Sequence, residues 1–106
     1  FDCRALPNPG KYEEFKNLTG KDAPVVKFLE DREEMSAFME HIISLVDQAV
    51  SVYQHRGFTR LMVNFGCTGG QHRSVYAAEK LYSFIRSKYP VHIVISHREL
   101  ERLKPE

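Results

Sequence analysis

The chain has 106 residues, enough for one domain with a single modest core. Its 15 basic and 14 acidic residues nearly balance, so no net field would recruit nucleic acid or a membrane surface, and no run of 18 apolar residues predicts a membrane-spanning helix. The two cysteines are too few for a disulfide framework, and we expect a cytoplasmic protein whose thiols stay reduced.

The N-terminal end is typical of a strand that stops early. Residues Phe1–Arg4 resemble the tail of a β-strand, and Pro7 and Pro9 then remove backbone donors that a strand needs. Because the sequence opens abruptly on this strand end, we expect the chain to be part of a longer protein. The domain itself is expected to span residues 1–106.

Two helices are expected next. Residues 23–29 predict a short helix with Asp22 as its N-cap. Asp31–Gln54 carries apolar residues at intervals of three and four, which is the stripe of an amphipathic helix, and Gly57 would end that helix as its C′ residue. The apolar stripe would pack against the remainder of the domain.

The C-terminal half predicts the order strand, helix, strand. Arg60–Phe65 and Val91–Ile95 are apolar runs typical of strands, and a helical pattern covers residues 75–87 between them. Glu99–Glu106 mixes charges and resembles a helical tail. Together with the first strand, this order predicts a small α/β domain whose mostly parallel sheet is flanked by helices through right-handed crossovers.

The junction between the second strand and its helix, Phe65–Ser74, carries glycine, thiol, hydroxyl, imidazole and guanidinium groups side by side. Glycines allow backbone N–H groups to turn inward, and the start of the helix adds a positive dipole end. Arg73 adds a planar fork of donors suited to a tetrahedral oxyanion. The pattern predicts a phosphate-binding strand–loop–helix at the carboxyl edge of the sheet. The alternative is that Gly66, Gly69 and Gly70 only permit a tight turn, which leaves the reactive side chains unexplained.

Two more pairs of residues would share this edge if all three strands are parallel. Asp2 and Arg4 follow the first strand, and His97 and Arg98 follow the third. We expect these side chains to contact the bound anion. The alternatives are a local salt bridge between Asp2 and Arg4 and, for His97 and Arg98, a solvated strand end.

Cys67 begins the pattern C-x-x-G-x-x-R-[ST], which resembles the phosphate loop of cysteine-dependent phosphatases. In that family an acidified thiolate attacks phosphorus while an arginine holds the equatorial oxygens. The resemblance implies Cys67 as the nucleophile and Arg73 as the phosphate clamp, and His97 would be the acid candidate if the third strand lies beside the second. The chain departs from that family at Gly66, where a histidine usually stands, and no aspartate-bearing acid loop follows the motif.

A fuller resemblance is to the C-terminal domain of RapZ, a bacterial family of adaptor and nucleotide-binding proteins. The matching stretches run in order from end to end: Phe1–Pro9, Leu18–Gly20, Asp22–Val25, Gly66–Val75 and His97–Glu101. The resemblance implies a domain that senses a small phosphorylated metabolite, glucosamine 6-phosphate in the best-known branch. It also implies RNA binding, oligomerisation, and a P-loop domain ahead of this one in full-length relatives. By position, the ligand-binding residues would be Asp2, Arg4, Asn8, Cys67, Thr68, Gly69, Gly70, His72, Arg73, Ser74, His97 and Arg98.

We therefore expect a ligand-binding regulatory module that is not an enzyme on its own, with the cysteine-dependent phosphatase as the alternative. The expected partner is a small phosphorylated metabolite or an inorganic anion; no metal and no cofactor are expected, and the full-length protein would be a homo-oligomer. RNA binding by this domain alone is expected to be weak, because the net charge is +1 and Arg102–Glu106 holds only two cations.

Overall fold

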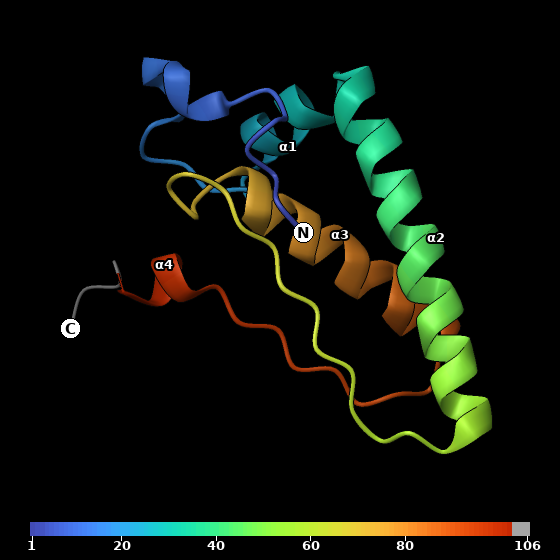
Figure 1. Ribbon diagram of the computed structural model, residues 1–106. Helices are drawn as coiled ribbons and strands as arrows, with labels where there is room; N and C mark the ends of the chain where they lie inside the picture. Colours follow the sequence, from blue (N-terminus) through green and yellow to red (C-terminus); the bar gives the residue numbers. More distant parts are fainter. Residues whose placement is uncertain (103–106) are drawn as a thin grey trace.

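The computed structural model describes residues 1–102, and most of them lie in helices (Figure 1). The elements in order are η1 (Pro9–Lys11), η2 (Glu13–Phe15), α1 (Ala23–Glu30), α2 (Glu33–Arg56), α3 (Arg73–Lys88) and α4 (Arg98–Arg102). Residues 103–106, which include the end of the expected helical tail and one of its two cations, lie outside the described residues.

The predicted helices are confirmed, with shifts of one or two residues at their ends. Asp22 occupies the N-cap of α1, but its carboxylate accepts the backbone N–H of Thr19 (2.7 Å) and none from the helix. α2 ends at Gly57, whose φ of 72° is a left-handed conformation that glycine adopts without steric cost. The local stripe and ending signals in the sequence therefore locate these helices.

The core lies between α1, α2 and α3, with α2 packed along α3 (Figure 1). One cluster of buried side chains joins α1 to the first halves of α2 and α3; it is formed by Cys3, Leu6, Val25, Leu29, Met35, Met39, Tyr76 and Ala77. A second cluster lies further along both long helices and is formed by Ile42, Val46, Leu81 and Ile85. Because Cys3 and Leu6 belong to the first cluster, the N-terminal segment is seated beside the start of α3.

The predicted α/β fold with a mostly parallel sheet is wrong. Within residues 1–102, β-type pairing is limited to one parallel bridge between Asp2 and Gly66, in which the Gly66 N–H donates to the carbonyl of residue 1 (2.9 Å) and the Gly66 carbonyl accepts the N–H of residue 3 (2.7 Å). The other two expected strands, Arg60–Phe65 and Val91–Ile95, are extended segments without a hydrogen-bonded ladder (Figure 1). The domain is a helical layer on which these two segments lie.

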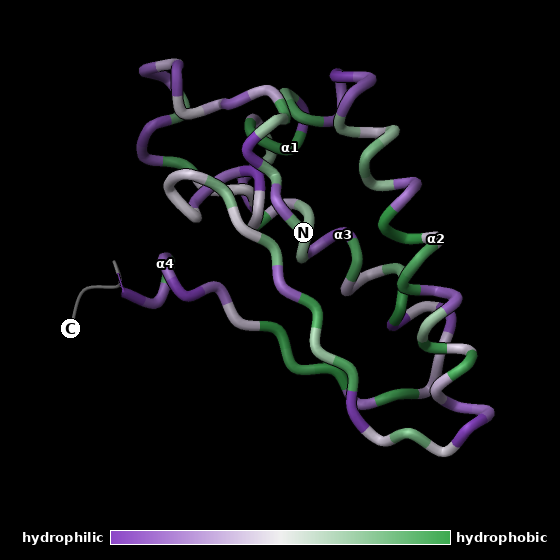
Figure 2. The backbone as a smooth tube through the Cα atoms, viewed as in Figure 1, coloured by the Kyte–Doolittle hydropathy of each residue, from purple (hydrophilic) through white to green (hydrophobic). Residues whose placement is uncertain are grey.

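The two extended segments bury alternate side chains on the helices instead of pairing with each other. Val63 and Phe65 of the first segment, and Val91 and Ile93 of the second, pack against the second cluster; Figure 2 shows the hydrophobic character of both segments. Both segments line a cavity of about 420 Å³. Alternation with a period of two predicts one buried face, but it does not specify which neighbour the backbone will bond. This is why the sequence pattern overestimated the sheet.

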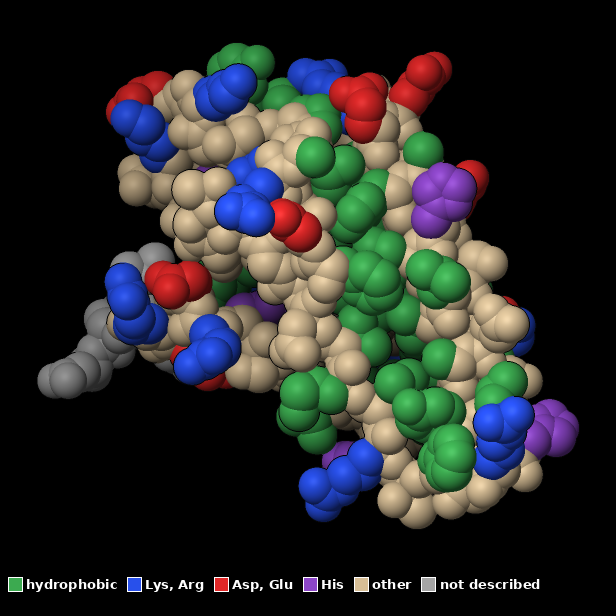
Figure 3. Space-filling model, viewed as in Figure 1, with side chains coloured by type: hydrophobic (Ala, Val, Ile, Leu, Met, Phe, Trp, Pro, Cys, Tyr) green, Lys and Arg blue, Asp and Glu red, His purple; other side chains and the backbone are tan. Residues whose placement is uncertain are grey.

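Charged and apolar side chains occupy different parts of the visible face. Figure 3 shows hydrophobic side chains gathered along the middle of α2, whereas charged side chains lie around α4, at the N-terminal segment and at the two ends of α2. Large apolar side chains that remain exposed include Leu45, Phe58, Met62 and Val94. Next to the loop that precedes α3, the exposed charged side chains include Asp2 and Arg4.

Gly20 fixes the distance between the N-terminal half and the start of α3. Its N–H donates to the Gln71 carbonyl (3.0 Å), and a Cβ at this position would lie 2.2 Å from the His72 oxygen and 2.5 Å from the Tyr76 nitrogen. We expect Gly20→Ala to lower the free energy of unfolding by about 2–3 kcal/mol, because backbone atoms would have to move. Urea denaturation measures this loss. Gly69→Ala is the control: a Cβ there meets nothing within 4 Å, and a similar loss in both variants would contradict the packing described.

Candidate anion-binding site

The loop between the Asp2–Gly66 bridge and α3 is tied to the N-terminal segment by a buried arginine. Arg73, the first residue of α3, is 4% exposed, and its Nη1 donates to the carbonyls of Arg4 and Leu6, at 2.9 Å each. A buried guanidinium is tolerated when its donors find acceptors, and here two carbonyls face it. The loop is therefore held at both of its ends against residues 2–6.

Two further side chains attach the loop to residues 15–18. Gln71 Nε2 donates to the carbonyls of Lys16 and Leu18, at 2.7 Å each, and His72 Nε2 lies 2.8 Å from the Phe15 carbonyl. Since a carbonyl can only accept, the proton of the His72 ring is assigned to Nε2 in this contact. His72 therefore uses this ring nitrogen to hold the loop, and it makes no side-chain cap on α3.

Donor groups converge on the sulfur of Cys67. The Sγ atom lies 3.2 Å from Ser74 Oγ. Burial raises the pKa of the Cys67 thiol, but hydrogen bonds from the Ser74 side chain and from the backbone N–H groups of Ser74 and Gly70, with the charge of Arg73, outweigh burial and lower the pKa overall. These donors sit at the start of a 16-residue helix, whose dipole adds positive potential. The loop is thus built to stabilise a negative charge.

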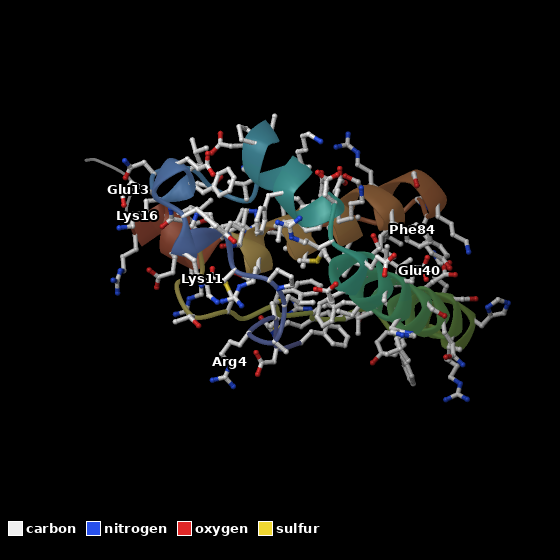
Figure 4. The ribbon with its side chains drawn as sticks, turned by 90° about the horizontal axis from the view of Figure 1, so that it is seen from above. Arg4, Lys11, Glu13, Lys16, Glu40 and Phe84 are labelled. Atoms are coloured by element: carbon white, nitrogen blue, oxygen red, sulfur yellow. The ribbon has the colours of Figure 1, made fainter. Side chains whose placement is uncertain are left out.

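Asp2 and Arg4 form a salt bridge beside this loop, as the first of the sequence-based alternatives expected. Arg4 Nη2 lies 2.7 Å from Asp2 Oδ2, and Arg4 Nε also donates to the carboxylate. The side-chain hydrogen bond from Arg4 is the main cause that lowers the pKa of Asp2 to about 2. Both side chains are exposed and, with Phe1, Gly66 and Cys67, they border an open hollow. Figure 4 shows Arg4 pointing outward from the body of the molecule.

His97 and Arg98 reach the other side of the loop. His97 Nε2 lies 2.6 Å from Glu79 Oε2 of α3, and its side chain is 10% exposed, so the solvated alternative does not describe this residue. Arg98 begins α4, whose Glu99 packs on the loop: a Cβ at Gly70, where φ is 65°, would lie 2.5 Å from Glu99 Cγ. Gly70, Ser74 and residues 97–99 line one end of the cavity between the extended segments.

The structure brings most of the predicted site residues together. Cys67 borders one hollow with Asp2 and Arg4, whereas Gly70 and Ser74 line a separate cavity with His97 and Arg98; Thr68 and Gly69 are exposed. Asn8 has a local role, because its Oδ1 accepts the Gly10 N–H (2.9 Å) and caps η1.

Sequence reasoning missed Glu79 and Glu99. No spacing in the sequence connects Glu79 to His97, whereas Glu99 belongs to one of the stretches that carried the family resemblance.

The described residues show neither a metal centre nor a membrane span. In residues 1–102, no group of three or more His, Cys, Asp or Glu side chains is arranged to hold a metal ion. Across the same range, every helix is too short or too polar to cross a bilayer.

Comparison with known proteins gives a family match over nearly the whole chain: the RapZ C-terminal domain matches residues 1–101. The chain is similar to a nucleotide-binding protein of Janthinobacterium sp. (strain Marseille), at 41% identity over 101 residues, which cover 95% of this chain and 34% of that protein. It is similar to nucleotide-binding protein YvcJ of Bacillus subtilis, at 38% identity over 102 residues, which cover 96% of this chain and 34% of the relative. A nucleotide-binding protein of Thermosipho africanus is 38% identical over 101 residues, with coverage of 95% and 36%. The chain spans about a third of the length of these relatives.

The alkylation rate of Cys67 tests whether the Ser74 hydroxyl stabilises the Cys67 thiolate. Ser74→Ala removes the hydroxyl that contacts Cys67 Sγ, so the thiol pKa should rise and alkylation by iodoacetamide at neutral pH should slow by about three- to tenfold. The pH profile of the alkylation rate, followed by mass spectrometry, measures the change. Ser87→Ala is the matched control, because Ser87 Oγ bonds to Phe84 O at the far end of the same helix. Equal rates for Ser74→Ala and wild type would show that the hydroxyl does not stabilise the thiolate.

Proposed function

We propose that this chain, which belongs to the RapZ C-terminal domain family, is a regulatory domain that binds a small phosphorylated metabolite at the loop Cys67–Ser74. The observation that carries the proposal is the arrangement at the start of α3: Cys67 Sγ lies 3.2 Å from Ser74 Oγ, and the backbone N–H groups of Gly70 and Ser74 help to lower the pKa of this thiol. The same donors would serve a phosphate oxygen, since amides at a helix start are suited to anions.

Exposed cations on both sides of the loop support a charged ligand. Arg4 borders the hollow next to Cys67, and Arg98 lines the cavity end that Gly70 and Ser74 also line. A phosphate seated at the loop would lie between these two side chains. Because a thiolate and a phosphate would compete for the same donors, binding would favour the neutral form of Cys67.

An amino-sugar phosphate, such as glucosamine 6-phosphate, suits the mixed charges around the loop. The Asp2 carboxylate is exposed and stays ionised at neutral pH, so it can accept an ammonium group while the loop holds the phosphate. The proposed contact set remains the one expected from the sequence: Asp2, Arg4, Asn8, Cys67, Thr68, Gly69, Gly70, His72, Arg73, Ser74, His97 and Arg98. Within this set, Arg73 and His72 act chiefly by holding the loop, because they already bond to backbone carbonyls.

A cysteine-dependent phosphatase is the second candidate, and the lowered pKa of Cys67 is the observation in its favour. Phosphoryl transfer needs more than a thiolate. The clamp would be Arg73, whose Nη1 is already bonded to two carbonyls, and the acid candidate His97 is bonded to Glu79. Binding without turnover therefore accounts better for the arrangement.

We propose macromolecular partners for a longer protein that would contain this domain, as well as for this chain alone. A net charge of +1 supports only weak RNA binding by the chain alone. This binding should weaken further as the salt concentration rises, because the release of counterions from RNA then contributes less free energy. A homo-oligomer and an adaptor role remain proposals for the full-length protein.

Calorimetric titration with glucosamine 6-phosphate, glucose 6-phosphate and glucosamine tests the proposal. We expect both phosphates to bind and glucosamine to bind far more weakly. Arg4→Gln and Arg98→Gln should each reduce affinity by about tenfold, the scale of a lost charged hydrogen bond. Arg86→Gln is the matched control, since Arg86 lies in the last turn of α3, at the opposite end from the loop, where its Nη1 donates to Tyr82.

The outcome that would contradict the proposal is equal affinity in the wild type and in both arginine variants, or no binding of either phosphate. Phosphate release is measured in the same samples. Turnover of the sugar phosphates that disappears in Cys67→Ser would favour the phosphatase, because serine keeps the small polar shape but loses the thiolate.

A further inference from the structure

The parallel bridge between Asp2 and Gly66 sets the register of the residues around it. In a parallel pair, residues that follow the bridged pair lie opposite each other, and side chains alternate between the two faces. Phe1 and Phe65, one residue before the bridge, follow this rule, since their ring centroids are 5.6 Å apart. Cys3 and Cys67, one residue after the bridge, must therefore lie opposite each other on the same face as the two phenylalanines.

Both cysteines are free, and their burial agrees with this register. Cys3 is 0% exposed within the first cluster, and Cys67 packs against that cluster. Neighbouring strands run about 4.8 Å apart, and disulfides join Cα atoms separated by about 4.4–6.8 Å. The spacing expected from the bridge therefore falls within the range that a disulfide spans.

The two thiols differ in the way that a reactive and a resolving cysteine differ. Cys67 is half-buried and borders the open hollow next to Arg4, so a small oxidant can reach it, and its pKa is lowered. Burial, and then the neighbouring Cys67, raise the pKa of Cys3 to about 11, so Cys3 stays a neutral thiol. Oxidation should therefore begin at Cys67.

We propose that Cys3 and Cys67 form a reversible disulfide when hydrogen peroxide oxidises the domain. The Cys67 thiolate attacks one peroxide oxygen, the O–O bond breaks, and the products are Cys67 sulfenic acid and hydroxide. The Cys3 sulfur then attacks the sulfenic sulfur, and the departing hydroxyl takes the Cys3 proton and leaves as water. In total, the two thiols give up two electrons and peroxide becomes two waters. A dithiol reductant then restores both thiols by thiol–disulfide exchange.

The disulfide would change the anion site. It holds the Cys67 sulfur toward Cys3, fixes the loop to the N-terminal segment, and removes the thiolate that Ser74 and Gly70 stabilise. We expect oxidation to weaken phosphate binding at the loop, a consequence that rests on the proposed function, whereas formation of the bond does not.

The test counts thiols in the 106-residue chain, which has no cysteines besides these two. Reduced protein is treated with a small excess of hydrogen peroxide, denatured, blocked with N-ethylmaleimide and weighed intact. The wild type should lose both adducts, become lighter by two hydrogen atoms and stay monomeric, and dithiothreitol should restore both adducts. Cys3→Ala should instead accumulate a Cys67 sulfenic acid that dimedone traps; Cys3→Val provides a second variant if alanine destabilises the core.

Two results would overturn the proposal. One is a wild type in which Cys67 is oxidised while Cys3 keeps its maleimide adduct. The other is a disulfide that forms only between chains, or no faster in the native protein than in urea, because either would show that the native register does not pair the thiols. The mass readout requires no ligand, so failure of metabolite binding leaves this test intact; titration of the oxidised protein with glucosamine 6-phosphate then measures the effect on the loop.

Discussion

The contact from Arg73 Nη1 to the carbonyls of Arg4 and Leu6 is the interaction on which the site depends. It joins residues 67 and 69 positions apart in the chain, inside a region that excludes water, where an unpaired guanidinium would be costly. The bridge at Gly66 and the bonds from Gln71 and His72 add to it. Together they fix both ends of the loop, and this gives the amides of the loop a defined direction.

The same contact bears on whether the proposed site binds a phosphate or transfers it. An arginine bonded to two carbonyls stabilises the loop, but it has less freedom to follow a phosphoryl group through a transition state. What the loop retains is a set of donors around one anionic position and exposed cations on either side. It also keeps the Cys67 thiol at the border of an open hollow, so the position that stabilises an anion is also accessible to small oxidants.

Local features were predictable from the sequence, and contacts between distant residues were not. The stripe of α2, its end at Gly57 and the donor-rich start of α3 arise from neighbouring residues, and the structure has all three. The sheet was predicted wrongly because alternation in residues 60–65 and 91–95 is satisfied by packing on the helices. The hydrogen bonds from Arg73 to backbone carbonyls could not be predicted from side-chain types, because every residue has a carbonyl. The Asp2–Arg4 salt bridge could be considered from the sequence because the two residues are only two positions apart.

We propose above all that the loop before α3 holds the phosphate of a small metabolite. Backbone amide NMR during titration with glucosamine 6-phosphate tests it most directly, because the shifts report which N–H groups gain an acceptor. We expect the largest saturable changes at Gly69, Gly70 and Ser74, and no such changes with glucosamine, which lacks the phosphate. Saturable changes confined to the cavity between residues 60–65 and 91–95, with the loop amides unmoved, would contradict it.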